Sequence, residues 1–288
     1  MRIIVCIKQV PDTAGGVKFK PDGTLDRAAM LAIMNPDDKA GLEAALRIKD
    51  AYPGTTVDVI TMGLPKADAV LREAMAMGAD KSYLVTDRPL GGADTWATSS
   101  TIAAAIREMG DYDIIFTGRQ AIDGDTAQVG PQIAEHLGIP VISYAQDVKV
   151  DPEKKTVTVQ RQFDDRYHVL EAKMPVLITA LSELNEPRYM TPMGIWDAID
   201  APVTDSNDAD YAEKYKEILA SDGKGVIIWH RKDIPTLKDE DMGLKGSPTK
   251  IAKASDKVRK GAGTIYKDLD PDQGAATICQ ALVEKHYI

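Results

Sequence analysis

The stretch Thr117–Gln132 reads T-G-R-Q-A-I-D-G-D-T-A-Q-V-G-P-Q and decides the fold. It follows the apolar run D-I-I-F at 113–116, which is typical of a buried strand, and it leads into a helical segment ending at Gly138. A strand, a polar loop and a helix in this order indicate an open α/β sheet, which binds ligands at the carboxyl ends of its strands. The stretch predicts a ligand site, although an ordinary polar connection fits the same residues.

Within this stretch, Gly118 and Gly124 allow a close backbone approach or a positive φ. Asp125 is expected to cap the helix and to leave the amides at 126–128 exposed to an anion. Asp123 and Asp125 are also spaced as a candidate acid and base, but turn formation and helix capping explain both residues equally simply.

Outside this stretch, strands alternate with helices. Strands are expected at 3–7, 57–63, 82–85 and 113–117, and helices at 36–52, 65–77 and 94–109. Such spacing implies right-handed βαβ units and a parallel sheet. The predicted fold is therefore a doubly wound, mostly parallel α/β sheet of the adenine-nucleotide-binding type.

The start of the first helix has two interpretations. Asn35 suits an N-cap, Pro36 suits the first helical position, and Asp37 and Asp38 lie favourably against the helix dipole. This pattern is sufficient for a plain helix start. The same residues follow a strand closely enough to contact a ligand at the sheet edge.

After Pro140 the pattern changes. Period-two alternation predicts an antiparallel excursion with strands at 148–150, 156–159, 167–172 and 175–180. From Leu184 the periodicity weakens, with a helix expected at 211–220, a strand at 226–229 and a last helix at 273–285. We therefore expect an α/β domain at 1–196 and an extended C-terminal arm at 197–288.

Composition excludes several classes of protein. The 288 residues carry a formal net charge of -9, which opposes nucleic-acid binding. No apolar run approaches the roughly 18 residues of a membrane span, and the N-terminal apolar run is too short for a signal peptide. Cys6 and Cys279 do not form a disulfide framework, so a cytoplasmic location is expected.

The sequence contains no evident catalytic constellation and no metal-ligand spacing. The four histidines are scattered, and G-x-S-x-G, Walker A and G-x-G-x-x-G motifs are absent. We predict no catalytic residue and no metal. Any redox chemistry would belong to a bound cofactor.

Four ordered segments resemble the β subunit of electron-transfer flavoproteins. They are Val5–Asp12, Met34–Pro36, Gly118–Thr126 and Leu184–Tyr189. The resemblance implies a heterodimer with an α subunit that carries its own FAD, with the arm at 197–288 packing on that subunit. It also implies an adenine nucleotide in a pocket of this chain, which is AMP in the ordinary branch of the family and FAD in the electron-bifurcating branch.

Two further segments, Gly91–Thr98 and Gly246–Thr249, resemble the bifurcating branch. Thr95 and Thr98 would reach the cofactor, although simple helix-start chemistry also explains them. The cofactor-binding residues expected from the sequence and the resemblance together are Cys6, Asn35, Pro36, Asp37, Asp38, Met62, Asp94, Thr95, Thr98, Gly118, Arg119, Gln120, Ala121, Ile122, Asp123, Gly124, Asp125, Thr126, Ala127, Gln128 and Val129.

Membership of the bifurcating branch implies an electron carrier that oxidises NADH only within a larger complex. One electron would pass to ferredoxin or flavodoxin, and the other, through the α-subunit FAD, to a flavin dehydrogenase that docks at Leu184–Trp196. One alternative is a non-bifurcating β subunit that holds structural AMP. Another is a stand-alone adenine-nucleotide-binding regulator. An ATP-cleaving ligase is disfavoured because no Gly/Ser-rich loop follows the first strand.

Overall fold

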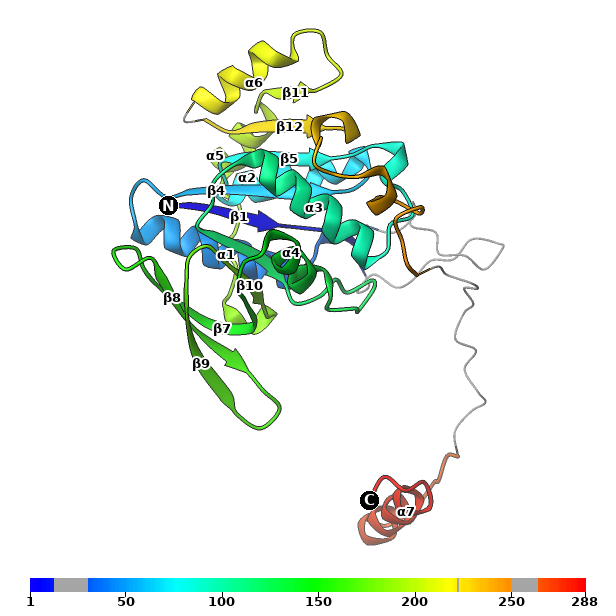
Figure 1. Ribbon diagram of the computed structural model, residues 1–288. Coiled ribbons are helices and arrows are strands. Elements are labelled where there is room, and N and C mark those ends of the chain that lie inside the picture. The colour runs from blue at the N-terminus through cyan, green and yellow to red at the C-terminus, as the bar shows by residue number, and fades with distance from the viewer. Residues whose placement is uncertain (13–30, 222, 250–263) are drawn as a thin grey trace.

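The computed structural model describes residues 1–12, 31–221, 223–249 and 264–288 (Figure 1). Its centre is a ten-stranded sheet in the order β11-β12-β5-β4-β1-β6-β10-β7-β8-β9. These strands are β1 (Arg2–Cys6), β4 (Thr56–Met62), β5 (Lys81–Val85), β6 (Ile114–Gly118), β7 (Val141–Asp151), β8 (Thr156–Gln162), β9 (Tyr167–Lys173), β10 (Val176–Ala180), β11 (Val203–Asp205) and β12 (Gly225–Trp229). A separate antiparallel pair joins β2 (Gln9–Pro11) to β3 (Ala32–Met34).

The strands from β11 to β7 pair in parallel, and only the β7-β8 and β8-β9 pairs in this sheet are antiparallel. The predicted doubly wound sheet with an antiparallel excursion is confirmed.

Helices cover both faces of the parallel part (Figure 1). They are α1 (Pro36–Ala51), α2 (Asp68–Met77), α3 (Thr95–Met109), α4 (Val129–Leu137), α5 (Pro192–Ile199), α6 (Tyr211–Ala220) and α7 (Pro271–Glu284). Apolar residues of α1 and α2 belong to one core cluster, and those of α3, α4 and α6 belong to a second. Helix α5 packs on α2.

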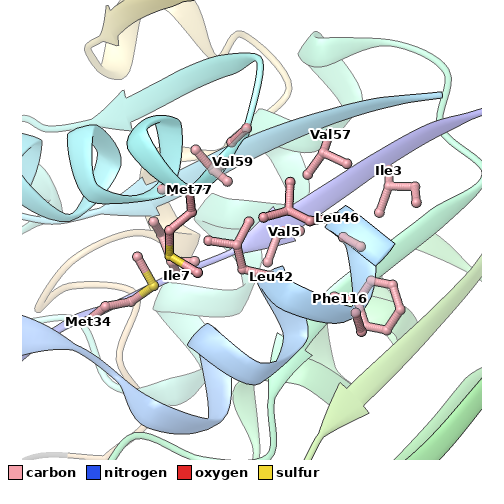
Figure 2. Close-up of a cluster of buried hydrophobic side chains, with 14 of the residues drawn as sticks. Ile3, Val5, Ile7, Met34, Leu42, Leu46, Val57, Val59, Met77 and Phe116 are labelled. Carbon is pink, nitrogen blue, oxygen red and sulfur yellow. The ribbon is translucent and has the colours of Figure 1, made fainter. Parts of the chain in front are cut away.

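The two clusters follow from the alternation of side chains along each strand. In β1, Ile3 and Val5 belong to the α1 cluster, whereas Ile4 and Cys6 belong to the α3 cluster. Figure 2 shows Leu42 of α1 close to Val5. Each such fully buried side chain contributes about 1.5–3 kcal/mol. This is why β1 is apolar from Ile3 to Cys6.

The order in which successive strands are added to the sheet reverses beside β1. The unit β1-α1-β4 moves to one side of β1, and the unit β5-α3-β6 returns to the other side. Neighbouring crossovers then leave the sheet on opposite faces, so a crevice opens beyond the carboxyl ends of β1 and β6.

Two parts of the chain differ from expectation. Strands β11 and β12 extend the main sheet next to β5, although the sequence-based division at residue 196 assigns them to the arm. Strand β7 begins at Val141, seven residues before the expected strand, because its first part pairs in parallel with β10. Both differences arise from long-range pairing.

The last helix, α7, lies apart from the sheet (Figure 1). The side chain of Asp270 accepts hydrogen bonds from the first amides of the helix, and no residue of α7 is buried. Its exposed apolar side chains include Ile278 and Val283. Among the described residues, no helix has the length and apolar character needed to cross a bilayer.

Candidate functional site

A cavity of about 770 Å³ opens at the crevice beyond β1 and β6. Its wall is built from the segments that follow β1, β4, β5 and β6, together with the first turns of α3 and α4 and one residue of the C-terminal segment. Sequence positions more than 200 residues apart thus meet at one sheet edge. This volume lies in the range of pockets that enclose small molecules and cofactors.

The loop between β6 and α4 forms a cradle for an anion. Ala127 has a φ of 53°, and Gln128 follows it with a right-handed backbone. Alternation between left- and right-handed residues makes successive N–H groups converge into an anion-binding nest. Among the described residues, the amides at 126–129 have no acceptor. The dipole of α4 adds to the favourable potential at this point.

Helix α4 begins later than the sequence predicts. Its first residue is Val129 and its N-cap position is Gln128, so the expected cap by Asp125 is wrong. Asp125 has a φ of 49° and accepts a hydrogen bond from the side chain of Gln120. Asp123 forms an ion pair with Lys8 at 2.6 Å. These contacts give both acids structural roles in the loop.

Asn35 occupies the N-cap position of α1, but its side chain does not cap the helix. Its Nδ2 donates to the Gln120 carbonyl at 2.8 Å, and its Oδ1 accepts from the Ile122 amide at 3.1 Å. Asn35 therefore fixes the cradle loop from the helix on the other side of the sheet edge. The expected N-cap position of Asn35 is confirmed, but its side chain does not cap the helix because these tertiary contacts use both side-chain groups.

Asp38 joins the ends of two strands. Its Oδ2 accepts from the Lys8 amide and its Oδ1 from the Gly118 amide, both at 2.8 Å. Gly118 lies so close to α1 that a Cβ atom there would be 2.2 Å from Asp38 Oδ1. The glycine is therefore required for close approach. In contrast, Gly124 faces open space and has no such requirement.

Arg119 is a cation on the wall of the same cavity. Its Nε lies 3.3 Å from Asp37 Oδ2, yet both atoms are buried without a hydrogen-bond partner among the described residues. The other oxygen of Asp37 accepts from the Ser182 amide. The Arg119 side chain is partly exposed, and its buried Nε atom lacks an acceptor. A guanidinium of this kind on the wall of a cavity fits an anionic ligand, which would supply further acceptors.

The far wall consists of the start of α3 held by the C-terminal segment. Asp94 caps α3 by accepting from the Ala97 amide, and its Oδ2 accepts from both the amide and the hydroxyl of Thr249. The Ser247 hydroxyl in turn accepts from the Asp94 amide. Thr95 Oγ1 donates to Gln128 Oε1 at 2.9 Å, so this wall contacts the cradle directly.

Most of the predicted cofactor-binding residues lie on the cavity wall. Those that line it are Cys6, Asp38, Met62, Asp94, Thr95, Thr98, Gly118, Arg119, Gln120, Ala121, Gly124, Thr126, Ala127, Gln128 and Val129. Six others support the wall from behind or beside it. They are Asn35, Pro36, Asp37, Ile122, Asp123 and Asp125.

Several wall residues are absent from the sequence-based set. They include Lys8, Leu90, Gly92, Ile102, Ile133 and Thr249. The position of Lys8 after β1, and of Leu90 after β5, could have indicated them, because every parallel strand of this sheet ends at the same edge. No periodicity around Thr249 indicates that it returns to this edge, and only the resemblance of Gly246–Thr249 to the bifurcating branch drew attention to this segment.

The donor set suits an adenine nucleotide or dinucleotide. Convergent amides and Arg119 can hold phosphate, hydroxyls of Thr95 and Thr98 can bind polar groups, and apolar side chains can enclose a ring. Burial, with Asp38 as a further contributor, raises the pKa of the Cys6 thiol, which is therefore not a ready nucleophile. Among the described residues, no group of three or more His, Cys, Asp or Glu side chains is arranged to hold a metal ion.

An electron transfer flavoprotein domain model matches residues 22–210, which is more than half of the chain. The chain belongs to the electron transfer flavoprotein family. Most of the site described above lies within the matched part, and the wall residues outside it are Cys6, Ile7, Lys8 and Thr249.

Electron transfer flavoproteins similar to this chain match over its whole length. The β subunit from Clostridium acetobutylicum is 49% identical, with 100% of each chain covered. The caffeyl-CoA reductase-Etf complex subunit CarD from Acetobacterium woodii is 46% identical, also with 100% of each chain covered. The acryloyl-CoA reductase electron transfer subunit gamma from Anaerotignum propionicum is 44% identical over the same coverage. The resemblance to the β subunit of this family is confirmed.

Asp38 gives the flavoprotein chain a testable dependence on pH. Burial raises the pKa of Asp38 to about 7, against the opposing effect of its hydrogen bonds with Asn35, Lys8 and Gly118. The unfolded carboxyl group releases its proton near pH 3.9, so between about pH 4 and 7 the folded state binds more protons. We expect the free energy of unfolding to fall as the pH rises through this interval.

The variant Asp38→Asn should lack this part of the pH dependence because its amide does not ionise. Urea unfolding at pH 5 and pH 8 measures the difference for the two proteins. Asp123→Asn is the matched control, since it removes an exposed acid of the same loop and should keep the slope. An equal slope in wild type and Asp38→Asn would contradict the assignment.

Proposed function

We propose that this chain is the β subunit of an electron-bifurcating flavoprotein and binds FAD in the cavity beyond β1 and β6. The observation that carries the proposal is the closed far wall. Asp94, Ser247 and Thr249 bond the C-terminal segment to the start of α3, and this extends the cavity well beyond the phosphate cradle. A ligand of AMP size would occupy only part of such a space.

The residues of the chain have distinct roles in holding the cofactor. The amides at 126–129 bind the pyrophosphate, and Arg119 supplies a countercharge. Asp38 and Asn35 hold the cradle in place. Thr95 and Thr98 bind the half of the cofactor that lies beyond the phosphates. When bound, FAD accepts a hydride from NADH and passes electrons on singly.

In this function the chain works within a larger assembly. It forms a heterodimer with an α subunit that carries its own FAD, and one electron leaves to ferredoxin or flavodoxin. The other reaches a flavin dehydrogenase through the α-subunit FAD. The names of the relatives from Acetobacterium and Anaerotignum, which belong to reductase systems, support a partner of this kind.

Two surfaces suit these partners. The segment Leu184–Trp196, proposed to contact the dehydrogenase, includes Tyr189, which is 93% exposed, and the exposed Met193 and Trp196 of α5. The C-terminal arm ends in α7, which buries none of its apolar side chains and is proposed to pack on the α subunit. Large apolar side chains left exposed together are typical of protein interfaces.

Counting the cofactors of the purified heterodimer tests the proposal. Two flavins per heterodimer, with both bleached by NADH, are expected. One FAD together with one AMP would contradict it and would identify a non-bifurcating carrier with a structural nucleotide. A colourless protein that is stable without a second chain would instead identify an adenine-nucleotide-binding regulator.

A further inference from the structure

We propose that residues 243–249 form a strap that opens and closes the cavity beyond β1 and β6, and that the bonds between this strap and Asp94 set how fast a ligand enters and leaves. This rests on the proposed function, which places a cofactor in that cavity. The strap belongs to neither a helix nor a strand. Its last residue, Thr249, lines the cavity, so movement of the strap changes the wall directly.

The strap lies against one loop, residues 89–94, which leads from β5 into α3. The Leu244 amide donates to the Gly91 carbonyl at 3.1 Å. Leu244 also lies next to Gly92, where an added Cβ atom would be 3.3 Å from the Leu244 Cβ. Leu244 nevertheless remains 58% exposed, so this contact buries little apolar surface. The strap is therefore held mainly by polar contacts.

The polar contacts converge on Asp94 and form a latch. The buried Ser247 accepts at Oγ from the Asp94 amide at 2.9 Å. Thr249 donates its amide and its hydroxyl to Asp94 Oδ2, at 2.9 and 2.7 Å. Burial opposes the charge on Asp94, but the bonds from Thr249 and from the α3 amides outweigh it and lower the pKa of this carboxyl group. The latch bonds from Thr249 therefore go to a charged acceptor, which strengthens them.

The rest of the cavity wall is anchored more firmly. It consists of segments that directly follow strands of the sheet and of the first turns of α3 and α4. The cradle loop is further fixed by Asn35 and by the ion pair between Lys8 and Asp123. Local openings of a folded protein use the segments with the fewest buried contacts. Release of the strap is therefore the opening of this cavity that disrupts the fold least.

A gate and an ordinary ligand contact predict different kinetics. The latch joins two parts of this chain, so weakening it destabilises the closed strap equally with and without ligand. A larger open fraction speeds both entry and exit and leaves the equilibrium dissociation constant nearly unchanged. Loss of a ligand contact, in contrast, mainly speeds exit.

The test measures both rates on the purified heterodimer, with FAD as the probe and the flavins counted first. Release is followed by chasing bound radiolabelled FAD with unlabelled FAD, and entry by mixing flavin-depleted heterodimer with FAD. Thr249→Val removes the hydroxyl of an exposed residue with little change of shape, and it should speed both rates roughly tenfold, the usual loss for a hydrogen bond to a charged group. Ser247→Ala should also speed both.

Lys245→Ala is the matched control, because Lys245 lies on the strap, is exposed and makes no side-chain hydrogen bond or ion pair with the described residues. It should keep both rates of the parent protein. The FAD of the α subunit serves as an internal control, since the latch lies outside its site. Its release phase should be the same in every variant.

The flavin count separates failure of the gate from failure of the proposed function. If two flavins are present and Thr249→Val speeds release alone, or changes neither rate, the strap is a fixed wall and the proposed function stands. If the count gives one FAD and one AMP, the proposed function fails, and the same chase with radiolabelled AMP decides whether the strap is a gate.

Discussion

Replacing Gly118 with alanine is expected to destabilise the protein and to empty the cavity that is proposed to bind the nucleotide. A Cβ atom at this position would lie 2.2 Å from Asp38 Oδ1 and 2.8 Å from the Asp38 backbone nitrogen. These atoms belong to the first turn of α1, which packs against β6 and cannot move independently. Forcing a methyl group into such a space costs about 1–3 kcal/mol.

The expected consequence reaches beyond stability. Gly118 donates its amide to Asp38, and that bond sets the position at which the chain leaves β6 and enters the cradle. Moving this point displaces the amides at 126–129, which are proposed to bind the phosphate groups. We therefore expect Gly118→Ala to be purified with far less adenine nucleotide than the parent protein.

Gly124→Ala provides the control for stability. Gly124 belongs to the same loop, but an added Cβ would meet no atom within 4 Å. Its free energy of unfolding should change by less than about 0.5 kcal/mol. Urea unfolding and nucleotide extraction measure the two effects of Gly118→Ala. Equal stability of the two glycine variants would show that α1 and β6 are less tightly coupled than described.

Gly118 also illustrates what the sequence could predict. A glycine directly after an apolar strand indicates that the backbone needs freedom or space, and the location of the site followed from that pattern. The sequence did not predict whether each glycine is required for a positive φ or for a close approach of another segment. Gly118 is required because Asp38 of α1, 80 residues earlier in the chain, lies close to it. Gly124 has neither a close neighbour nor a positive φ.

The apolar runs rich in β-branched residues predicted strands most reliably. Strands such as β1 and β6 are buried on both faces. Such strands need apolar side chains at successive positions, and the sequence shows this directly. Strand β11 has only three residues at the edge of the sheet, so it leaves too short a pattern to recognise. Its place in the sheet depends on pairing with β12.

Local capping rules failed where tertiary contacts compete with them. Asn35 and Asp125 are residue types that favour N-caps, yet each uses its side chain to build the loop between β6 and α4. The left-handed backbone at Ala127 could not be predicted either, because alanine does not favour this conformation. At the site, tertiary contacts thus override these local preferences.

A second large effect is expected from Glu43 of α1, whose removal should release the segment Leu184–Trp196 that is proposed to contact the dehydrogenase. Glu43 is buried and accepts from the amide, Nε and Nη2 of Arg188 and from Nε of Arg47. Glu43→Ala would leave the Arg188 guanidinium without its main partner. We expect a loss of about 2–4 kcal/mol, less than for a fully buried pair because Arg188 remains partly exposed.

Asp50→Ala is the matched control, since Asp50 is an exposed second partner of the same arginine. It should cost no more than about 1 kcal/mol. Urea unfolding measures both losses, and docking of the purified dehydrogenase measures the functional one. If Glu43→Ala and Asp50→Ala are equally stable, Glu43 does not anchor the segment.

Glu43 also predicts a dependence on pH with the opposite sign to that of Asp38. Burial alone would raise the pKa of Glu43, but hydrogen bonds from Arg188 and Arg47 outweigh it and lower the pKa below the ordinary value. Its contribution to stability is therefore complete above about pH 4.3 and is lost as the pH falls through the lowered value. Glu43→Gln should remove this acid-induced loss while leaving the decline between pH 4 and 7 that Asp38 causes. Unfolding free energies measured from pH 3 to pH 8 distinguish the two carboxyl groups, and an unchanged acid limb in Glu43→Gln would show that other acids cause it.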